Sequence, residues 1–189
     1  SMGGMIAQTV AIHHPQRVRT LIPIMSSTGS RDLPEATLKT RWALLSPAPH
    51  DDKEAYLQHS IDKWPYFDGP AHPMPANHIR RVSGLAFDRG LNRAGAGRQL
   101  AAIFASGDRT EQLKKLDVPT MVMHGEDDPL LPLAHGIAIA EAVPNAELVI
   151  IEGFGHSFPP SVFSRWTNEI DRFAKKYELG EETAVLSRS

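Results

Sequence analysis

The sequence contains no cysteine among its 189 residues. This excludes disulfide bonds, thiolate metal ligands and cysteine nucleophiles, although it is compatible with any cellular compartment. The sequence also has no apolar run that approaches the roughly 18 residues needed for a membrane-spanning helix, and its start is not a charged-then-apolar leader. We therefore expect a soluble chain with no membrane partner, and we favour the cytoplasm as its location.

Neither sign of charge predominates. The 20 lysine and arginine residues nearly balance the 22 aspartate and glutamate residues, which gives a formal net charge of −2. Because the basic residues are scattered, the sequence does not indicate electrostatic binding of nucleic acid. The length is that of one domain, and 41% of the residues are hydrophobic, enough to bury a core.

Helical and strand patterns alternate in the first and last parts of the chain. Helices are predicted where apolar residues recur at helical spacing, over residues 3–14, 133–143 and 160–176. The first of these ends before Pro15, which cannot continue a helix. Short continuous apolar runs, typical of strands buried on both faces of a parallel sheet, occur at 17–27, 119–125 and 146–152. This alternation predicts an α/β fold.

The middle of the chain, residues 28–117, has a different pattern. Prolines and histidines are frequent there and no strand pattern is convincing, so we predict a mainly helical insertion. Its helices are expected at 35–46, 52–64, 77–87 and 94–106, the second capped by Asp51 or Asp52. Its aromatic residues are compatible either with a core of the insertion's own or with a substrate pocket. The α/β core would then comprise residues 1–27 and 118–177, with a polar tail at 178–189.

Three side chains could together catalyse hydrolysis; two of them follow predicted strands, and Ser1 would do so if a strand preceded it. Ser1-Met2-Gly3 is the second half of the pattern G-x-S-x-G, a tight turn that exposes a serine hydroxyl. Asp128 follows the run at 119–125, and His156 follows the run at 146–152. Because active sites of open parallel sheets form at the carboxyl ends of the strands, the three residues are expected to meet in space.

These motifs resemble those of the α/β-hydrolase family. Residues 1–5 (SMGGM) look like its nucleophile elbow, residues 124–132 (HGEDDPLLP) like its acid loop, and residues 153–156 (GFGH) like its histidine loop. The resemblance implies an α/β-hydrolase-like parallel sheet, of which this chain holds only the later strands, with a helical cap inserted at 28–117. It also implies a serine esterase or lipase-like enzyme with a Ser-Asp-His triad in the family's chain order.

The resemblance implies a role for each matched residue. Ser1 would attack the acyl carbon, His156 would accept the serine proton, and Asp128 would orient the imidazole. Asp127 is the rival acid, but the family spacing favours Asp128. The backbone N–H of Met2 would be one oxyanion donor. His124, at a strand end, is expected to be structural.

The resulting expectation is a serine hydrolase that cleaves a small or medium carboxylic ester or related acyl compound through an acyl-enzyme. Since the upstream strands of the family are absent, we expect a second polypeptide or copy to supply them. No cofactor is implied, and the histidine spacings indicate no metal site. Two alternatives stay open: a non-catalytic fragment or interaction module, and an enzyme that uses the α-amine of Ser1 as its base.

Overall fold

The structure is a computed structural model of the chain, and it describes residues 1–178. The predicted polar tail at 178–189 therefore lies almost wholly outside the described residues. The α-helices are α1 (Met2–His13), α2 (Leu38–Leu45), α3 (Lys53–Lys63), α4 (Ala76–Asp88), α5 (Arg93–Ser106), α6 (Thr110–Leu113), α7 (Ala134–Ala142) and α8 (Phe163–Lys176). Three short 3₁₀ helices are η1 (Pro15–Arg17), η2 (Trp64–Phe67) and η3 (Pro160–Val162).

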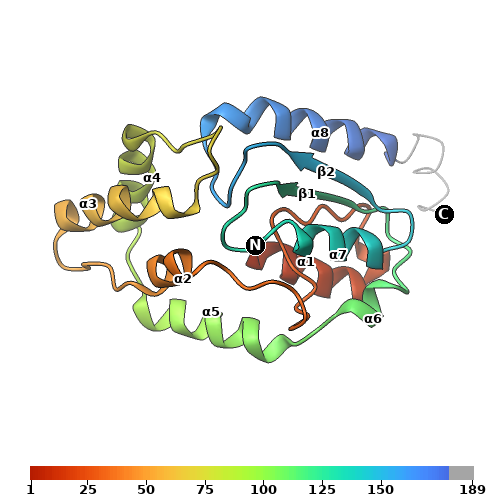
Figure 1. Cartoon of the computed structure of the whole chain (residues 1–189). Helices are drawn as coiled ribbons and strands as arrows, with labels where there is room; N and C mark the ends of the chain where they lie inside the picture. Colours follow the sequence, from red (N-terminus) through yellow and green to blue (C-terminus); the bar gives the residue numbers. More distant parts are fainter. Residues whose placement is uncertain (179–189) are drawn as a thin grey trace, which may run out of the picture.

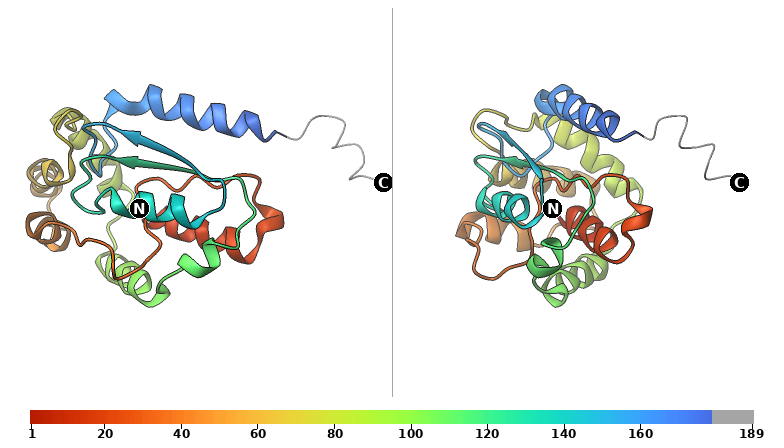
Figure 2. Two further views of the ribbon diagram at one scale, coloured as in Figure 1. Left: turned by 45° about the vertical axis from the view of Figure 1, so that its right-hand side comes forward. Right: turned by 90° about the vertical axis from the view of Figure 1, so that its right-hand side faces the viewer.

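The sheet is built from the parallel pair β1 (Met121–Gly125) and β2 (Glu147–Ile151), which are joined through α7. Met121 pairs with Glu147 at one end of the register, and Gly125 pairs with Ile151 at the other. Helix α8 lies over one face of this pair, whereas α1 and α7 lie on the opposite face (Figures 1 and 2). Helix, sheet and helix thus form the layers of an α/β fold, as the sequence predicts.

Alternating side chains of β1 supply both halves of the core. Val122 packs with residues of α1, α6 and α7, whereas Met121 and Met123 pack under α8 with Phe154 and Trp166. All five β1 residues are buried. This two-sided burial accounts for the continuous apolar run, because a strand covered on both faces has no solvent side to alternate with.

The predicted strand over 17–27 forms only in part. Leu21 makes an isolated parallel bridge with Thr120, just before β1, and Ile24 makes one with Met123 of β1. Backbone hydrogen bonds of 2.9 to 3.1 Å join Leu21, Pro23 and Met25 to β1 and to the residues just before it. Pro23 has no N–H to donate, so one bond of the ladder is missing in the middle of the segment. At Met25 the backbone enters the left-handed region, with φ of 46°, and the segment ends.

The prediction of a fully buried strand over 146–152 is also wrong. Four of the five β2 residues are only partly buried or exposed, and Ile150 is 38% exposed. Within the described residues β2 pairs on one side only, with β1. It is therefore an edge strand.

Helices α2, α3 and α4 lie beyond the carboxyl ends of the two strands (Figures 1 and 2). Helix α3 is capped by Asp52, whose side chain accepts a hydrogen bond from the N–H of Ala55 at 3.1 Å, so of the two predicted caps Asp52 is the one used. The end of the predicted insertion behaves differently, because Leu113 and Leu116 pack in the core with Val122. Residues 110–116 therefore belong structurally with the sheet layer, and the helical insertion proper ends near α5.

Candidate active site

A buried histidine–aspartate contact lies where the two strand ends meet. His156 follows β2, and its Nδ1 lies 2.6 Å from Oδ2 of Asp128, in the loop after β1. The Asp128 side chain is fully buried. Its other oxygen accepts hydrogen bonds from the backbone N–H groups of Leu130 at 2.9 Å and Leu131 at 2.8 Å. These three contacts compensate the buried carboxylate and hold it in a single orientation.

Asp127 does not join this pair. It is exposed, and its backbone N–H donates to the carbonyl of Phe154 at 3.0 Å. The structure therefore brings Asp128, and not its neighbour, to the imidazole. With Nδ1 engaged by Asp128, Nε2 is the ring nitrogen of His156 left for proton transfer.

Ser1 lies at the amino end of α1 and lines the same cavity as His156. Two hydrogen bonds hold its backbone: its nitrogen donates to the carbonyl of Ile24 at 2.8 Å, and its carbonyl accepts from Oγ of Ser26 at 3.0 Å. Within residues 1–178, no hydrogen bond joins the Ser1 hydroxyl to His156. Such contacts are often long without substrate and tighten when it binds.

Met2 is the first residue of α1. The N–H groups of a first helical turn have no acceptor within the helix. The carbonyl of Ser1 takes the N–H groups of Gly4 and Met5, at 2.9 and 3.3 Å. The backbone N–H groups of Met2 and Gly3 lie at the positive end of the helix, where a developing negative charge would be stabilised.

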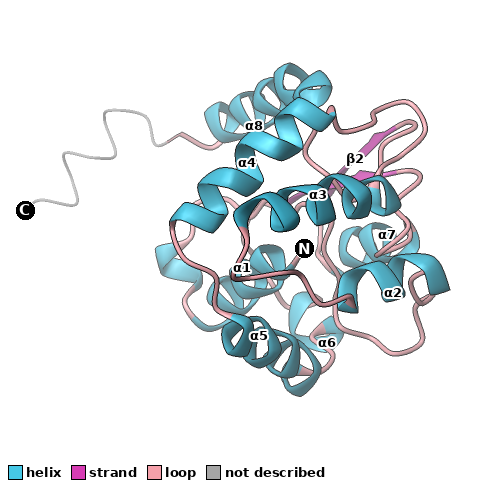
Figure 3. Ribbon diagram, turned by 90° about the vertical axis from the view of Figure 1, so that its left-hand side faces the viewer, coloured by secondary structure: helices cyan, strands magenta, loops and turns pink. Residues whose placement is uncertain are grey.

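The cavity beside Ser1 has a volume of about 350 Å³. Its apolar walls come mainly from the helical insertion, and its polar groups come from α3, from Ser1 and from His156 in the loop after β2. The lining residues are Ser1, Leu44, Ala48, Tyr56, His59, Ser60, Lys63, Trp64, Phe67, Leu130 and His156. Figure 3, which looks toward the insertion, shows the chain start near the middle of the view, with α2 and α3 around it.

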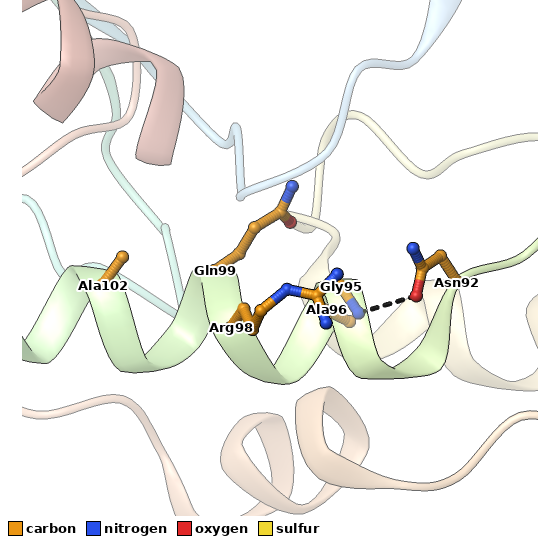
Figure 4. Close-up of a pocket in the computed structure, with 6 residues that line it drawn as sticks. All are labelled: Asn92, Gly95, Ala96, Arg98, Gln99 and Ala102. Carbon is orange, nitrogen blue, oxygen red and sulfur yellow. Dashed lines mark hydrogen bonds between the residues drawn. The ribbon is translucent and has the colours of Figure 1, made fainter.

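Other hollows of the surface lack this chemistry. One of about 550 Å³ runs along α5, and its lining residues all come from that helix and its cap (Figure 4). In it, Asn92 caps α5 by accepting the N–H of Gly95 at 2.8 Å. Another, of about 450 Å³, lies between the loop at 27–32 and the end of α5. Neither is lined by His156 or Asp128.

A sequence profile described as alpha/beta hydrolase fold matches residues 1–160. The match covers most of the chain and includes each residue of the site. The chain belongs to the α/β-hydrolase family.

Relatives by sequence match most of the chain. The 2-hydroxymuconate semialdehyde hydrolase of Pseudomonas putida is 28% identical over 207 residues, covering 99% of this chain and 63% of that protein. The poly(3-hydroxyalkanoate) depolymerase of Ectopseudomonas oleovorans is 31% identical over 164 residues, covering 84% of this chain and 53% of that protein. Other relatives carry the names of a methylesterase and a haloperoxidase.

Among solved structures, a meta-cleavage product hydrolase of Pseudomonas fluorescens IP01 matches with a TM-score of 0.68 at 16% identity. The match covers 94% of this chain and 63% of that one. At this identity the likeness shows the fold alone. This chain thus spans between about half and two thirds of the length of these hydrolases.

The residues that anchor the histidine loop were not predicted from the sequence. The backbone N–H of His156 donates to the carbonyl of Phe67 at 2.6 Å, and Oγ of the fully buried Ser157 donates to Asp68 at 2.6 Å. Gly69 packs so closely against Gly155 that neither has room for a side chain. Asp68-Gly69-Pro70 reads only as a turn in the sequence, so no local signal indicated its distant partner.

His124 has the structural environment expected for it. It is buried, and its Nε2 donates to the carbonyl of Leu131 at 2.7 Å. The pKa of His124 is lowered, mainly because the imidazole is buried. The Leu131 carbonyl and Asp128 act in the opposite direction, whereas His156 and His135 lower this pKa further. Among residues 1–178, no three His, Asp or Glu side chains are grouped to hold a metal ion. No helix in that part is long and apolar enough to cross a membrane.

Proposed function

We propose that this chain carries the triad of a serine hydrolase that cleaves small or medium carboxylic esters or related acyl compounds. Ser1 is the nucleophile, His156 the general base and Asp128 the orienting acid. The observation that carries the proposal is the buried hydrogen bond between His156 and Asp128 beside the cavity that Ser1 also lines. The esterases among its relatives support the same class of reaction.

The proposed reaction has two steps. The Ser1 oxygen attacks the carbonyl carbon while His156 Nε2 takes the hydroxyl proton; the bond to the alcohol oxygen breaks, and the alcohol leaves with that proton. Water then attacks the acyl-enzyme, again giving a proton to His156, and Ser1 recovers it as the acid is released. The N–H of Met2 would stabilise the oxyanion in both steps, a contribution of about 3 kcal/mol for one such donor.

We also propose that a second polypeptide segment or copy completes the sheet. Residues 20–25 pair with β1 along one edge, and on α1 the side chains of Ile6 and Val10 are 54% and 41% exposed. An open strand edge next to exposed apolar residues is a surface that proteins normally cover. The second oxyanion donor would come from the covering segment.

The test is covalent labelling with a fluorophosphonate, followed by intact mass spectrometry and peptide mapping. The chain is labelled alone and together with a polypeptide that supplies the upstream strands. A single adduct on Ser1, lost in Ser1→Ala and retained in the loop variant Ser30→Ala, supports the proposal. Absence of an adduct in both preparations overturns it and leaves the alternative of a non-catalytic interaction module.

The variant His156→Ala separates the triad from a mechanism that uses the amine of Ser1. Burial lowers the pKa of that amine to about 6, so it would be largely neutral at pH 7. The triad predicts that His156→Ala nearly abolishes labelling, whereas the amine mechanism predicts little loss. The exposed His13→Ala serves as the matched histidine control.

A further inference from the structure

One wall of the cavity is basic. Tyr56, His59, Ser60 and Lys63 recur at helical spacing on one face of α3 and line the cavity opposite the strand-end loops. The hydroxyl of Ser60 is already engaged, since it donates to the carbonyl of Tyr56 at 2.9 Å. The groups left to recognise a ligand on this wall are therefore Tyr56, His59 and Lys63, of which Lys63 is the cationic one.

Lys63 is a cation without a counter-ion in the described part of the chain. Lysines such as Lys53, Lys114, Lys175 and Lys176 pair with carboxylates at 2.6 to 2.7 Å. No carboxylate of residues 1–178 lies within salt-bridge distance of Lys63. Burial lowers the pKa of its ammonium group, and no carboxylate in that part of the chain raises this pKa again. Asp62, its neighbour in sequence, is exposed and accepts a hydrogen bond from Gln58 at 2.9 Å.

His59 is a second polar group of this wall, available to form hydrogen bonds. Its Nε2 lies 3.5 Å from the hydroxyl of Ser46. The pKa of His59 is lowered first by burial and then by the charge of Lys63, one helical turn away, while Asp62 opposes both effects. None of the residues that line the cavity is an aspartate or a glutamate. The carboxylate of Asp128, behind the lining residue His156, is already engaged by that histidine.

A half-buried ammonium in an apolar cavity loses hydration that the protein does not replace. A ligand that brings its own negative charge restores that interaction, and it does so in surroundings where a charge-assisted hydrogen bond is strong. A neutral ester of the same size offers no such compensation. A charged acyl compound would therefore gain an interaction in this cavity that a neutral one lacks.

We propose that the substrate of this site is an acyl compound that carries a carboxylate, and that Lys63, assisted by His59, binds it. The scissile carbonyl then lies at Ser1, and the carboxylate lies against α3. The proposal rests on the hydrolase function proposed above and makes Lys63 a specificity-determining residue. The simplest substrates of this class are half-esters of dicarboxylic acids.

The experiment compares monomethyl esters of dicarboxylic acids with five to eight carbons against the corresponding dimethyl esters. It uses enzyme that has first been shown to take up fluorophosphonate at Ser1, and it follows acid release by titration at constant pH. The measured quantity is the ratio of kcat/KM for each half-ester to kcat/KM for its diester. We expect this ratio to favour one half-ester and to fall roughly ten- to hundredfold in Lys63→Met.

Three further variants define the cause. Lys63→Arg keeps the charge and is expected to retain most of the preference, whereas Lys63→Glu reverses it. Lys115→Met removes one charge from an exposed position away from the cavity and is expected to leave the ratio unchanged. The free dicarboxylates should slow labelling of Ser1 in the wild type and not in Lys63→Met, which gives a readout independent of turnover.

The outcomes separate this proposal from the one it rests on. If Ser1 is labelled but the ratio is the same in the wild type and in folded Lys63→Met, the carboxylate proposal fails and the hydrolase proposal stands. If Ser1 is not labelled at all, the hydrolase proposal fails first. Thermal melting of each variant shows whether it is folded.

Discussion

The backbone N–H of His156 donates to the carbonyl of Phe67 at 2.6 Å. This bond joins the histidine loop of the sheet layer to η2, at the end of α3. The next pair of residues repeats the connection, since Ser157 donates to Asp68. The helical insertion therefore does more than cover the cavity, because it also positions the proposed general base.

This connection predicts that Ser157→Ala impairs both stability and labelling. The variant leaves one oxygen of Asp68 without its donor in a half-buried position, which should lower the free energy of unfolding by about 1 to 3 kcal/mol. Urea denaturation and the rate of fluorophosphonate labelling measure the two effects. The control is Ser161→Ala, an exposed serine whose hydroxyl lies 3.2 Å from Nδ1 of His72; equal effects of the two variants would contradict the prediction.

The adjacent acids Asp127 and Asp128 offer a matched pair. Asp128→Asn replaces the acceptor of His156 Nδ1 and favours the wrong imidazole tautomer, so labelling of Ser1 should slow by roughly 10³- to 10⁴-fold. Asp127→Asn removes the same charge one residue away, from an exposed side chain, and should change the rate little. A comparable loss in both variants would mean that the acid has been wrongly assigned.

The two glycines of α1 are expected to respond oppositely to alanine. A Cβ on Gly4 would lie 2.6 Å from Cβ of Ser26 and 2.7 Å from its Oγ, whereas a Cβ on Gly3 meets nothing within 4 Å. Gly4→Ala should therefore push α1 from Ser26, lower stability by about 1 to 3 kcal/mol and displace Ser1. Gly3→Ala should raise stability by up to about 1 kcal/mol, because alanine is the better helix former. Urea denaturation of both variants, with labelling of Ser1, tests this contrast.

We expect the buried His124 to make the stability of the fold depend on pH. Its pKa is lowered in the folded state, so between that pKa and the ordinary value of about 6.5 the unfolded chain binds more protons. The contribution of neutral His124 to folding stability is therefore complete above about pH 6.5. It is lost as the pH falls from there toward the lowered pKa of the folded state. His124→Gln should be less stable at pH 8 but should lose less stability on acidification. Melting temperatures between pH 8 and pH 5 check this; parallel curves would show that another group causes the acid lability.

Local sequence patterns sufficed for the α/β alternation and for several element ends. Helix α1 ends before Pro15, α3 begins at its cap Asp52, and β1 is a continuous apolar run. These features depend on neighbouring residues, through the missing N–H of proline, a side-chain cap or burial on both faces. The proposed order of serine, acid and histidine came instead from the resemblance of three short motifs to those of the α/β-hydrolase family.

Only the tertiary structure decided which of these residues meet. The gap that Pro23 leaves in its ladder, the exposure of β2 at an edge and the packing of Leu113 in the core depend on neighbours far along the chain. The same holds for the bond between Ser157 and Asp68, and for the place of Lys63 in the wall of the cavity. A sequence shows the type and local spacing of each residue, whereas long-range pairing and burial depend on how separate elements pack together.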